Sequence, residues 1–428
     1  MQITPPWFVL PDPHKNCEPV IILGAGLAGC HTAYELATRN VKVVLLDANR
    51  NIAGGASANP VGIVKPFITR DTDFASQFYI EAFNFLLDRL DTNHALRAQS
   101  AFNACGVLQV VDKTYPNNPI YQTCTSAQAS KIAGTFIDNE AIYFARGGHL
   151  NPQAMCKFVV NHPNIEVMLN TSVTKVTCNN SIWSLTTEPT IRDLNNTDKT
   201  LTCNTLILAN GERLNHFEQT QALPITSARG QTSGFKTTTP NTLKTAVTGK
   251  HYAIPINDTV LVGATFKRDD NNKTPQRADH DKNFIGLQKL LPSLETKSNS
   301  VSEFCGIRAT TPDRLPIVGP VPNFAAYNQN YELIKHGLPE NQYPNATYQD
   351  NLFTIGGFGS RGIVSAPYCA MLLAEQLCKT TQSISDPSSQ NKLASPHELE
   401  NWLSLLHPGR FAIRALKRGH PLVYSEAL

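Results

Sequence analysis

Several features that would assign this chain to other classes of protein are missing from its sequence. No apolar run approaches the roughly 20 residues that a helix needs to cross a bilayer. The first twenty residues lack the basic start and the apolar stretch of a secretory signal. We therefore expect a cytoplasmic protein with no membrane partner.

The residues for metal binding or hydrolysis are also not arranged as such sites require. The ten cysteines are scattered, with no C-x-x-C pair and no His/Cys cluster at metal-ligand spacing. We expect reduced thiols and no metal. No Ser/His/Asp or paired-carboxylate pattern suggests hydrolysis, and a net charge of +3 is too small to indicate nucleic-acid binding without a local basic patch.

The composition is that of an ordinary globular protein, with 41% hydrophobic and 17% charged residues. At 428 residues the chain is long enough for one large domain or two interleaved ones. We expect a monomer.

The clearest local pattern lies near the N-terminus. The apolar run 20–23 ends in glycines, the segment 30–39 has helical spacing, and the strand-like run 41–46 ends on Asp47. This order predicts a βαβ unit with a glycine-rich turn after its first strand.

The turn GAGLAG (24–29) matches the G-x-G-x-x-G pattern of dinucleotide-binding proteins in the required setting. Gly24 would make the tight turn, Gly26 would admit the pyrophosphate, and Gly29 would allow close helix packing. The N-terminus of the helix that follows would offer N–H groups and a positive dipole to the phosphates, and Leu27 and Ala28 are further candidate contacts. Asp47 is placed to accept hydrogen bonds from the adenosine ribose. A glycine-rich turn without a ligand is the alternative.

Two further glycine-rich loops favour FAD over NAD, because a longer cofactor needs more contacts. The first spans 54–62, with Ala56, Ser57 and Asn59 as candidate contacts. The second spans 356–362 between a strand at 352–355 and a helix at 366–379. Its candidate contacts are Gly357, Phe358, Gly359, Ser360 and Arg361. A helix N-terminus there would stabilise the negative charge that develops on a reduced flavin.

The remaining patterns predict an α/β fold in which a Rossmann-like FAD-binding domain is interleaved with a smaller β-rich substrate domain. The expected segments of the FAD-binding domain are 18–100, 147–215 and 303–380, and those of the substrate domain are 101–146 and 216–302. Residues 381–428 would form a linker and a basic helix. The stretch 379–396, rich in Ser, Thr and Gln, is expected to be a mobile connection.

Motifs along nearly the whole chain resemble the D-amino-acid-oxidase-like flavoenzymes. More narrowly, they are similar to the oxidoreductase domain of the bifunctional enzymes that build 5-methylaminomethyl-2-thiouridine in tRNA. The motifs are GAGLAG with Asp47, GASANPVG (54–62 region), LILANG (206–211), GIRATTPDRLPIVG (306–319) and GGFGSRGIVSAP (356–367). The resemblance adds Val173, Ala209 and Gly211 to the candidate FAD contacts.

The resemblance implies an enzyme that uses FAD to remove the carboxymethyl group from carboxymethylaminomethyl-uridine at the tRNA wobble position, leaving aminomethyl-uridine and glyoxylate. In the bifunctional enzymes a separate N-terminal domain then methylates the amine with S-adenosylmethionine. The present sequence begins at what resembles the linker. Methylation is therefore expected to belong to a separate protein or not to occur.

The resemblance also suggests catalytic residues. Arg308 would hold the substrate carboxylate, as the corresponding arginine does in glycine and sarcosine oxidases; a surface pair with Asp313 is the alternative. Tyr252 would face the substrate or be a core tyrosine. Lys267 would lie near the flavin and favour reaction with dioxygen, or be a solvated lysine. Lys65 would contact phosphate or substrate, or be exposed. Arg361 would meet either FAD or RNA.

A basic stripe near the C-terminus is the candidate RNA contact. Arg410, Arg414 and Lys417 fall on one face of an expected helix, and Arg418 adjoins them. A solvated cationic last turn that complements the helix dipole is the alternative. Two other functions stay open: a free glycine, sarcosine or D-amino-acid oxidase of the same fold, and a flavin-binding module that recruits tRNA without chemistry.

Overall fold

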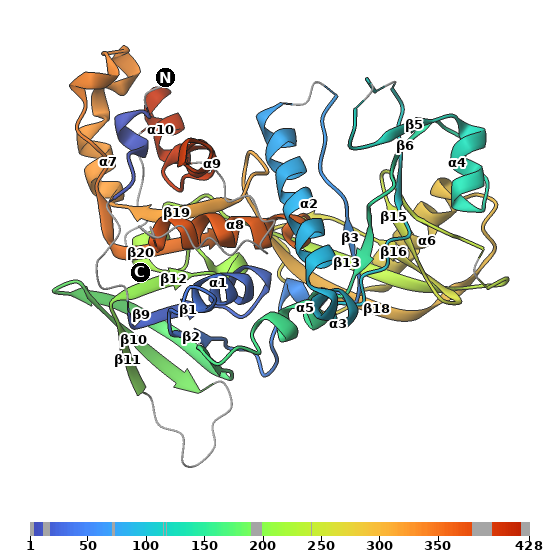
Figure 1. The fold of residues 1–428 in the computed structure, drawn as a ribbon, viewed down its shortest axis with the longest axis horizontal. Coiled ribbons are helices and arrows are strands. Elements are labelled where there is room, and N and C mark those ends of the chain that lie inside the picture. Colours follow the sequence, from blue (N-terminus) through green and yellow to red (C-terminus); the bar gives the residue numbers. More distant parts are fainter. Residues whose placement is uncertain are drawn as a thin grey trace.

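The computed structural model describes residues 4–11, 18–70, 73–113, 115–116, 118–189, 199–240, 242–378 and 396–420. Two lobes lie side by side, one built on a mainly parallel sheet and one on a large, mainly antiparallel sheet, with the long helix α2 (Phe74–Thr92) between them (Figure 1). The connection predicted at 379–396 falls, except for its last residue, outside this description.

A six-stranded sheet forms the first lobe, in the order β19-β20-β12-β1-β2-β8. Its strands are β1 (Val20–Leu23), β2 (Val43–Leu46), β8 (Ile165–Met168), β12 (Thr205–Leu208), β19 (Ile317–Pro322) and β20 (Tyr348–Gly356). All neighbours are parallel except β19, which runs antiparallel to β20. The parallel strands therefore end at one edge of the sheet, which is where open α/β sheets bind ligands.

Both faces of this sheet are covered, which explains why its strands are continuous apolar runs rather than alternating ones. On β1, Val20 and Ile22 pack toward helices α1 (Leu27–Ala37) and α8 (Gly362–Leu377). Ile21 and Leu23 pack toward the other side. That side carries the three-stranded sheet of β9 (Thr171–Asn179), β10 (Ile182–Pro189) and β11 (Lys199–Cys203).

A nine-stranded sheet forms the second lobe. Its strands are β4 (Val107–Val110), β5 (Gln122–Cys124), β6 (Ala141–Phe144), β13 (Thr226–Thr237), β14 (Ala246–Thr248), β15 (Tyr252–Ile256), β16 (Thr259–Gly263), β17 (Lys267–Arg268) and β18 (Thr296–Thr310). Helix α6 (Arg277–Leu290) packs against β13. The domain limit predicted at residue 303 falls inside β18, which pairs with β13 along its length; the predicted division into domains stays an interpretation.

Shorter elements complete the chain. The helices are α3 (His94–Gln99), α4 (Ser126–Ala133), α5 (Pro152–Val159), α7 (Phe324–Asn330), α9 (Pro396–Leu406) and α10 (Arg410–Lys417). The strands β3 (Gly62–Val64) and β7 (Gly148–Leu150) pair with each other. The 3-10 turns are Pro6–Phe8, Ala56–Ala58, Gly211–Arg213, Glu218–Thr220, Glu332–His336 and Glu340–Gln342. No helix in the described part of the chain is long and apolar enough to span a bilayer.

The start of one predicted helix differs from the observed one. The helix expected at 366–379 begins earlier, at Gly362, and contains Pro367 in its second turn. Proline lacks an N–H group, so the sequence favours a start close to it. In the structure, the last residues of the glycine-rich loop form the first turn of the helix, and Arg361 is its N-cap residue.

Candidate active site

The glycine-rich turn joins β1 to α1 at the carboxyl edge of the six-stranded sheet. Gly24 has a φ of +109°, and a Cβ atom there would lie 2.5 Å from the Ala209 carbonyl oxygen. A Cβ on Gly29 would overlap the carbonyl oxygen of Gly24. Both glycines are thus required by the tight turn and the close approach of helix α1, as the fingerprint predicts.

Asp47 follows β2 and faces the same turn. Its Oδ2 accepts a hydrogen bond from the Ala25 backbone N–H at 2.6 Å, and its Oδ1 accepts one from the Asn49 N–H at 2.7 Å. These bonds hold the carboxylate at the edge of the turn. Because an ionised carboxylate has about four lone-pair sites, it can still accept from a ribose hydroxyl.

The second glycine-rich loop lies against the first. The Ser57 hydroxyl accepts a hydrogen bond from the Leu27 N–H, the first of helix α1, at 3.1 Å. The Oδ1 atoms of Asn59 and Asn210 are both buried, and neither has a hydrogen-bond partner among the described residues. Buried polar atoms normally have partners. Two unsatisfied oxygens in one cavity wall therefore fit a polar ligand such as FAD.

The third loop connects β20 to α8 and reaches the nine-stranded sheet. The Gly359 N–H donates to the Ala309 carbonyl at 2.7 Å, so the loop is fastened to β18. The Arg361 guanidinium stacks over the Phe67 ring at 3.9 Å and donates to the Arg314 carbonyl at 3.3 Å. The first turn of α8 lines the cavity, which directs the positive end of the helix dipole into it.

The three loops enclose a cavity of about 990 Å³ that extends between the two sheets. This volume is at the upper end of the range for small-molecule sites, about 300–1,000 Å³. All but one of the predicted cofactor contacts line it: Gly24, Gly26, Leu27, Ala28, Asp47, Ala56, Ser57, Asn59, Val173, Ala209, Gly211, Gly357, Phe358, Gly359, Ser360 and Arg361. Gly29 packs behind the turn instead. The space, the orphan oxygens and the helix N-termini fit FAD.

Arg308 and Tyr252 enter the cavity from β18 and β15. Arg308 Nη1 donates to the Thr265 carbonyl at 3.3 Å. Burial raises the pKa of Tyr252, and the nearby Arg308 charge opposes that rise. Burial lowers the pKa of Arg308, although a guanidinium stays charged in proteins. The two side chains thus form one polar corner of the cavity.

Two glycines that sequence reasoning missed make room for this corner. A Cβ on Gly230 would overlap the Arg308 guanidinium, and one on Gly263 would lie 2.6 Å from Tyr252 Oη. Both glycines lie on strands adjacent to their partners in the sheet. Without the pairing register, neither position differs from any other glycine in a strand.

Lys65 is a half-buried cavity residue rather than an exposed one. Its Nζ donates to Gln109 Oε1 at 2.8 Å and to the Pro66 carbonyl at 3.1 Å. Burial, with a smaller contribution from the charge of Arg361, lowers its pKa to about 8. Lys65 therefore adds a positive charge to the cavity that can titrate near neutral pH.

Lys267 does not lie where a catalytic role requires. Its side chain is 64% exposed and forms an ion pair with Asp270 at 2.9 Å, outside the cavity wall. The structure therefore favours the alternative, a solvated surface lysine. Lys267 follows the strand as expected, but it points away from the cavity because its neighbour Phe266 takes the cavity-facing position.

The expected basic stripe on α10 is also corrected. Arg410 is only 3% exposed; its guanidinium makes two bonds to Asp313, at 2.9 and 3.0 Å, and further bonds to main-chain carbonyls. A buried, fully paired guanidinium offers nothing to a phosphate. Arg414 shares Asp313 at 2.6 Å but is partly exposed. Lys417 and Arg418 are exposed.

The ion pairs of Asp313 with α10 also argue against the alternative role of Arg308, a surface ion pair with Asp313. Burial alone would raise the pKa of Asp313, but Arg410 and Arg414 lower it to about 2. Asp313 thus pairs with the C-terminal helix, and Arg308 remains available to a ligand in the cavity.

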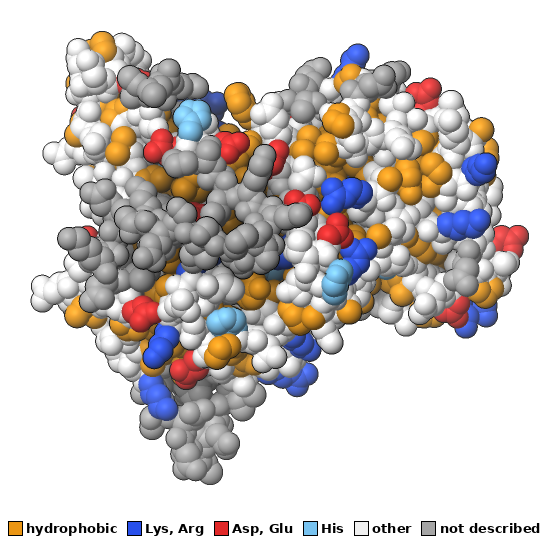
Figure 2. All heavy atoms as spheres, viewed as in Figure 1, with side chains coloured by type: hydrophobic (Ala, Val, Ile, Leu, Met, Phe, Trp, Pro, Cys, Tyr) orange, Lys and Arg blue, Asp and Glu red, His pale blue; other side chains and the backbone are white. Residues whose placement is uncertain are grey.

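On the face shown in Figure 2, basic and acidic side chains are interspersed and form no continuous basic surface. No cluster of described residues could hold a metal ion.

Comparison with known proteins places the site in a family. A family model described as FAD dependent oxidoreductase matches residues 19–376. The chain is 28% identical to the tRNA 5-methylaminomethyl-2-thiouridine biosynthesis bifunctional protein MnmC of Shewanella pealeana, covering 96% of this chain and 65% of that protein. The MnmC protein of Pseudomonas syringae pv. tomato is also 28% identical, with coverage of 97% and 62%. The chain thus spans less than two-thirds of these relatives.

Solved structures share the fold. Glycine oxidase from Geobacillus kaustophilus matches with a TM-score of 0.66 at 17% identity, covering 85% of this chain and 95% of that one. L-proline dehydrogenase from P. horikoshii matches with a TM-score of 0.66 at 15% identity, covering 96% and 100%. Together with the family match over most of the chain, the cavity and its three loops identify this protein as a member of the FAD-dependent oxidoreductase family.

Proposed function

We propose that this protein oxidises the carboxymethylaminomethyl group of a modified uridine at the wobble position of tRNA, giving aminomethyl-uridine and glyoxylate. The names of the curated relatives, which specify tRNA 5-methylaminomethyl-2-thiouridine biosynthesis, support this substrate. The observation that carries the proposal is a single cavity in which the cofactor loops meet Arg308 and Tyr252.

The reacting group is in effect an N-substituted glycine: a secondary amine that bears a methylene carboxylate. When bound, FAD would accept the hydride, with its two electrons, that leaves the methylene carbon. Water then splits the resulting imine into a primary amine and glyoxylate. We assign this oxidation alone to the chain; methylation of the amine would require a separate S-adenosylmethionine-dependent activity.

Arg308 is suited to hold the carboxylate. Its planar fork can bind both carboxylate oxygens, and the bond to Thr265 fixes its orientation while using only one of its five N–H donors. Tyr252 can add a hydroxyl donor beside it. The pair would hold the substrate by its carboxylate and leave the methylene directed toward the cofactor loops.

The charges in the cavity favour the reactive form of the amine. The amine must be neutral before hydride can leave the adjacent carbon. Lys65, Arg308 and Arg361 all line the cavity, whereas the acidic lining residues in the described chain are Asp47 and Glu212. Positive charges nearby disfavour the protonated ammonium and so lower the pKa of the bound amine.

The test uses the holoenzyme and tRNA that carries carboxymethylaminomethyl-uridine. We expect the flavin to bleach anaerobically, and we expect one glyoxylate and one aminomethyl-uridine for each group consumed, measured by mass spectrometry. Bleaching would exclude a module that binds tRNA without chemistry. The absence of glyoxylate with intact flavin would contradict the proposal. Steady peroxide formation from glycine, sarcosine or proline, with none from tRNA, would establish the free amino-acid oxidase instead.

A further inference from the structure

One large apolar side chain in the cavity wall has no role in the proposed reaction. Phe266 lies between β16 and β17, lines the cavity, and is 57% exposed. Most large apolar residues of this lobe are buried in its core clusters. An exposed aromatic ring at a ligand cavity, unlike one on an open surface, is typical of a binding contact.

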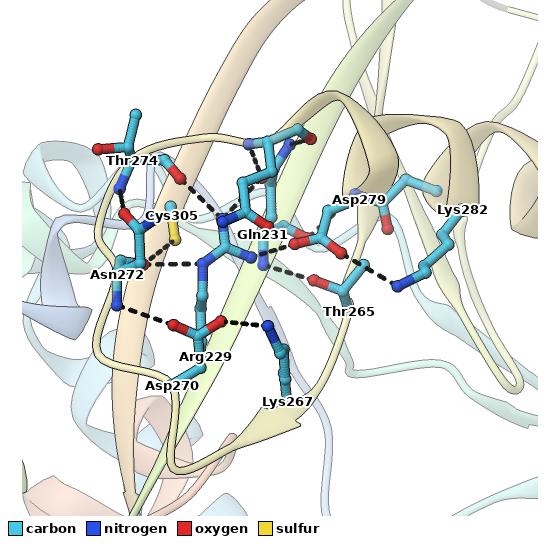
Figure 3. A network of polar contacts seen from close by, with 12 residues as sticks. Arg229, Gln231, Thr265, Lys267, Asp270, Asn272, Thr274, Asp279, Lys282 and Cys305 are labelled. Carbon is cyan, nitrogen blue, oxygen red and sulfur yellow. Dashed lines mark hydrogen bonds and ion pairs between the residues drawn. The ribbon is translucent and has the colours of Figure 1, made fainter.

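The loop at 269–276, which follows Phe266, is fixed by a network of polar contacts centred on the buried Arg229 (Figure 3). Arg229 is fully buried and forms an ion pair with Asp279. Its Nε donates to the Asn272 carbonyl at 2.7 Å and its Nη2 to the Thr274 carbonyl at 2.8 Å. The backbone at 272–274 is therefore anchored to β13. A fixed loop presents its side chains without the entropy cost of ordering them on binding.

The residue just before Phe266 is anchored in the same way. The Thr265 hydroxyl accepts from the Gln231 N–H at 3.0 Å, and the Thr265 carbonyl accepts from Arg308. Phe266 thus follows directly after a residue that contacts the carboxylate clamp. Its ring lies in the same cavity, at a solvent-accessible position, so a ligand that reaches Arg308 from solvent would extend past it.

Exposed cations also line the cavity. Arg213, Lys250 and Lys273 all line the cavity and are exposed. Lys273 pairs with Glu212 at 3.6 Å, while Arg213 and Lys250 form no ion pair with any residue in the described ranges. The acids Asp269 and Asp270 also lie on the loop, and Asp270 pairs with Lys267. Two unpaired cations and a ring suit single-stranded RNA, which is bound by base stacking and phosphate contacts.

We propose that Phe266 stacks against a nucleotide adjacent to the modified uridine, while Arg213 and Lys250 contact the neighbouring phosphates. This inference rests on the proposed tRNA function. A wobble base must leave the anticodon stack to reach Arg308, and unstacking uncovers the face of its neighbour. Phe266, at the exposed part of the cavity wall, replaces that lost stacking contact. The RNA surface therefore centres on the cavity rather than on α10.

The first test measures RNA binding alone. A fluorescent anticodon stem-loop without the modification is titrated into the holoenzyme, and anisotropy reports Kd. Phe266→Ala should weaken binding about 5- to 100-fold, the range that base stacking on an aromatic side chain supports. Phe266→Trp should retain binding, whereas Phe266→Leu, which keeps apolar bulk without a π-face, should lose most of it. Phe136→Ala is the matched control, because Phe136 is 48% exposed and does not line the cavity.

The second test separates stacking on a neighbour from contact with the reacting nucleotide. The same variants are assayed with modified tRNA and with the free carboxymethylaminomethyl-uridine nucleoside, which has no neighbouring bases. Phe266→Ala should raise KM for tRNA several-fold more than KM for the nucleoside, and Phe266→Trp should restore it. Equal changes with both substrates would overturn the inference, as would unchanged stem-loop binding in Phe266→Ala and Phe266→Leu.

Failure of the proposed function has a different result. Wild-type enzyme would then release no glyoxylate from modified tRNA, whatever residue stands at position 266. The stem-loop titration still decides the role of Phe266 in that case, because it requires no turnover. Retention of the yellow flavin spectrum in each variant confirms that the protein has folded.

Discussion

At one end of the cavity a ligand would meet mainly backbone, and at the other it would meet side chains. The cofactor end is made by the turn after β1 and the loop at 54–62, which are close in sequence and are held together by one bond from Leu27 to Ser57. The substrate end is made by Arg308, Tyr252 and Lys65, which come from three separate segments. Side chains added at Gly24 or Gly29 would collide with neighbouring backbone, whereas the side chains of the substrate end can be altered one group at a time.

The largest effect is expected from Gly29→Ala. The new methyl group would overlap the Gly24 carbonyl, and because that group is backbone it has little room to move. We expect purified protein with little or no bound FAD, at least about a tenfold loss of affinity, measured by flavin absorbance after gel filtration. Gly337→Ala is the control, because Gly337 does not line the cavity and a Cβ there meets nothing within 4 Å, so the strain of its positive φ falls outside the cofactor site. Equal FAD content in the two variants would show that the turn is not the cofactor site.

Arg308→Ala should impair substrate binding at the substrate end of the cavity and leave FAD binding unchanged. Removal of the clamp should cost roughly 2–4 kcal/mol of substrate binding, about a 30- to 1,000-fold loss in kcat/KM. The yellow cofactor should stay bound, since the two ends are separate. Rapid anaerobic reduction of the flavin measures the loss. Lys267→Ala is the control and should change the rate less than about twofold, as expected for an exposed ion pair. Loss of FAD from Arg308→Ala would show instead that Arg308 is structural.

A smaller effect is expected from Tyr252→Phe, which removes one hydroxyl and keeps the ring. A single hydrogen bond contributes about 0.5–1.5 kcal/mol, so KM should rise about 2- to 10-fold. Steady-state kinetics at fixed pH measure this change. A rise in KM with unchanged kcat would place Tyr252 in substrate binding; no change in either would indicate that it only fills the core.

The smallest effect is a pH dependence from Lys65. Its pKa of about 8 means that it is charged below pH 8 and neutral above. Since a positive charge assists the binding of a carboxylate, KM should be constant at low pH and rise a few-fold as the pH passes through 8. Lys65→Arg, which stays charged, should abolish this rise. Persistence of the rise in Lys65→Arg would show that Lys65 is not its source.

The same difference between the two ends explains what could be predicted from the sequence. Gly24, Gly26 and Asp47 lie within one βαβ unit, so their roles follow from local spacing. Arg308 and Tyr252 were indicated by resemblance alone, because only the pairing of β13, β15, β16 and β18 brings them together. Lys267 and Phe266 illustrate the limit: without the strand direction, the sequence does not tell which of two neighbours faces the cavity.

Arg410 was mispredicted for a related reason. Its spacing from Arg414 and Lys417 is that of a solvent-facing stripe, and the periodicity of a helix does not reveal a buried acid far away in the chain. Asp313 lies in the loop between β18 and β19, and only the tertiary fold places it under α10. A charged residue at helical spacing therefore predicts a face, but not the surroundings of that face.

The ion pair between Arg410 and Asp313 joins helix α10 to the loop between β18 and β19. The next residue, Arg314, offers its carbonyl to both Arg361 of the third loop and Tyr79 of α2. Shortening the chain past residue 410 would leave a partly buried carboxylate without its main cation, one bond away from the flavin loop. Helix α10 therefore stabilises the position of Asp313 and, through Arg314, that of the third loop.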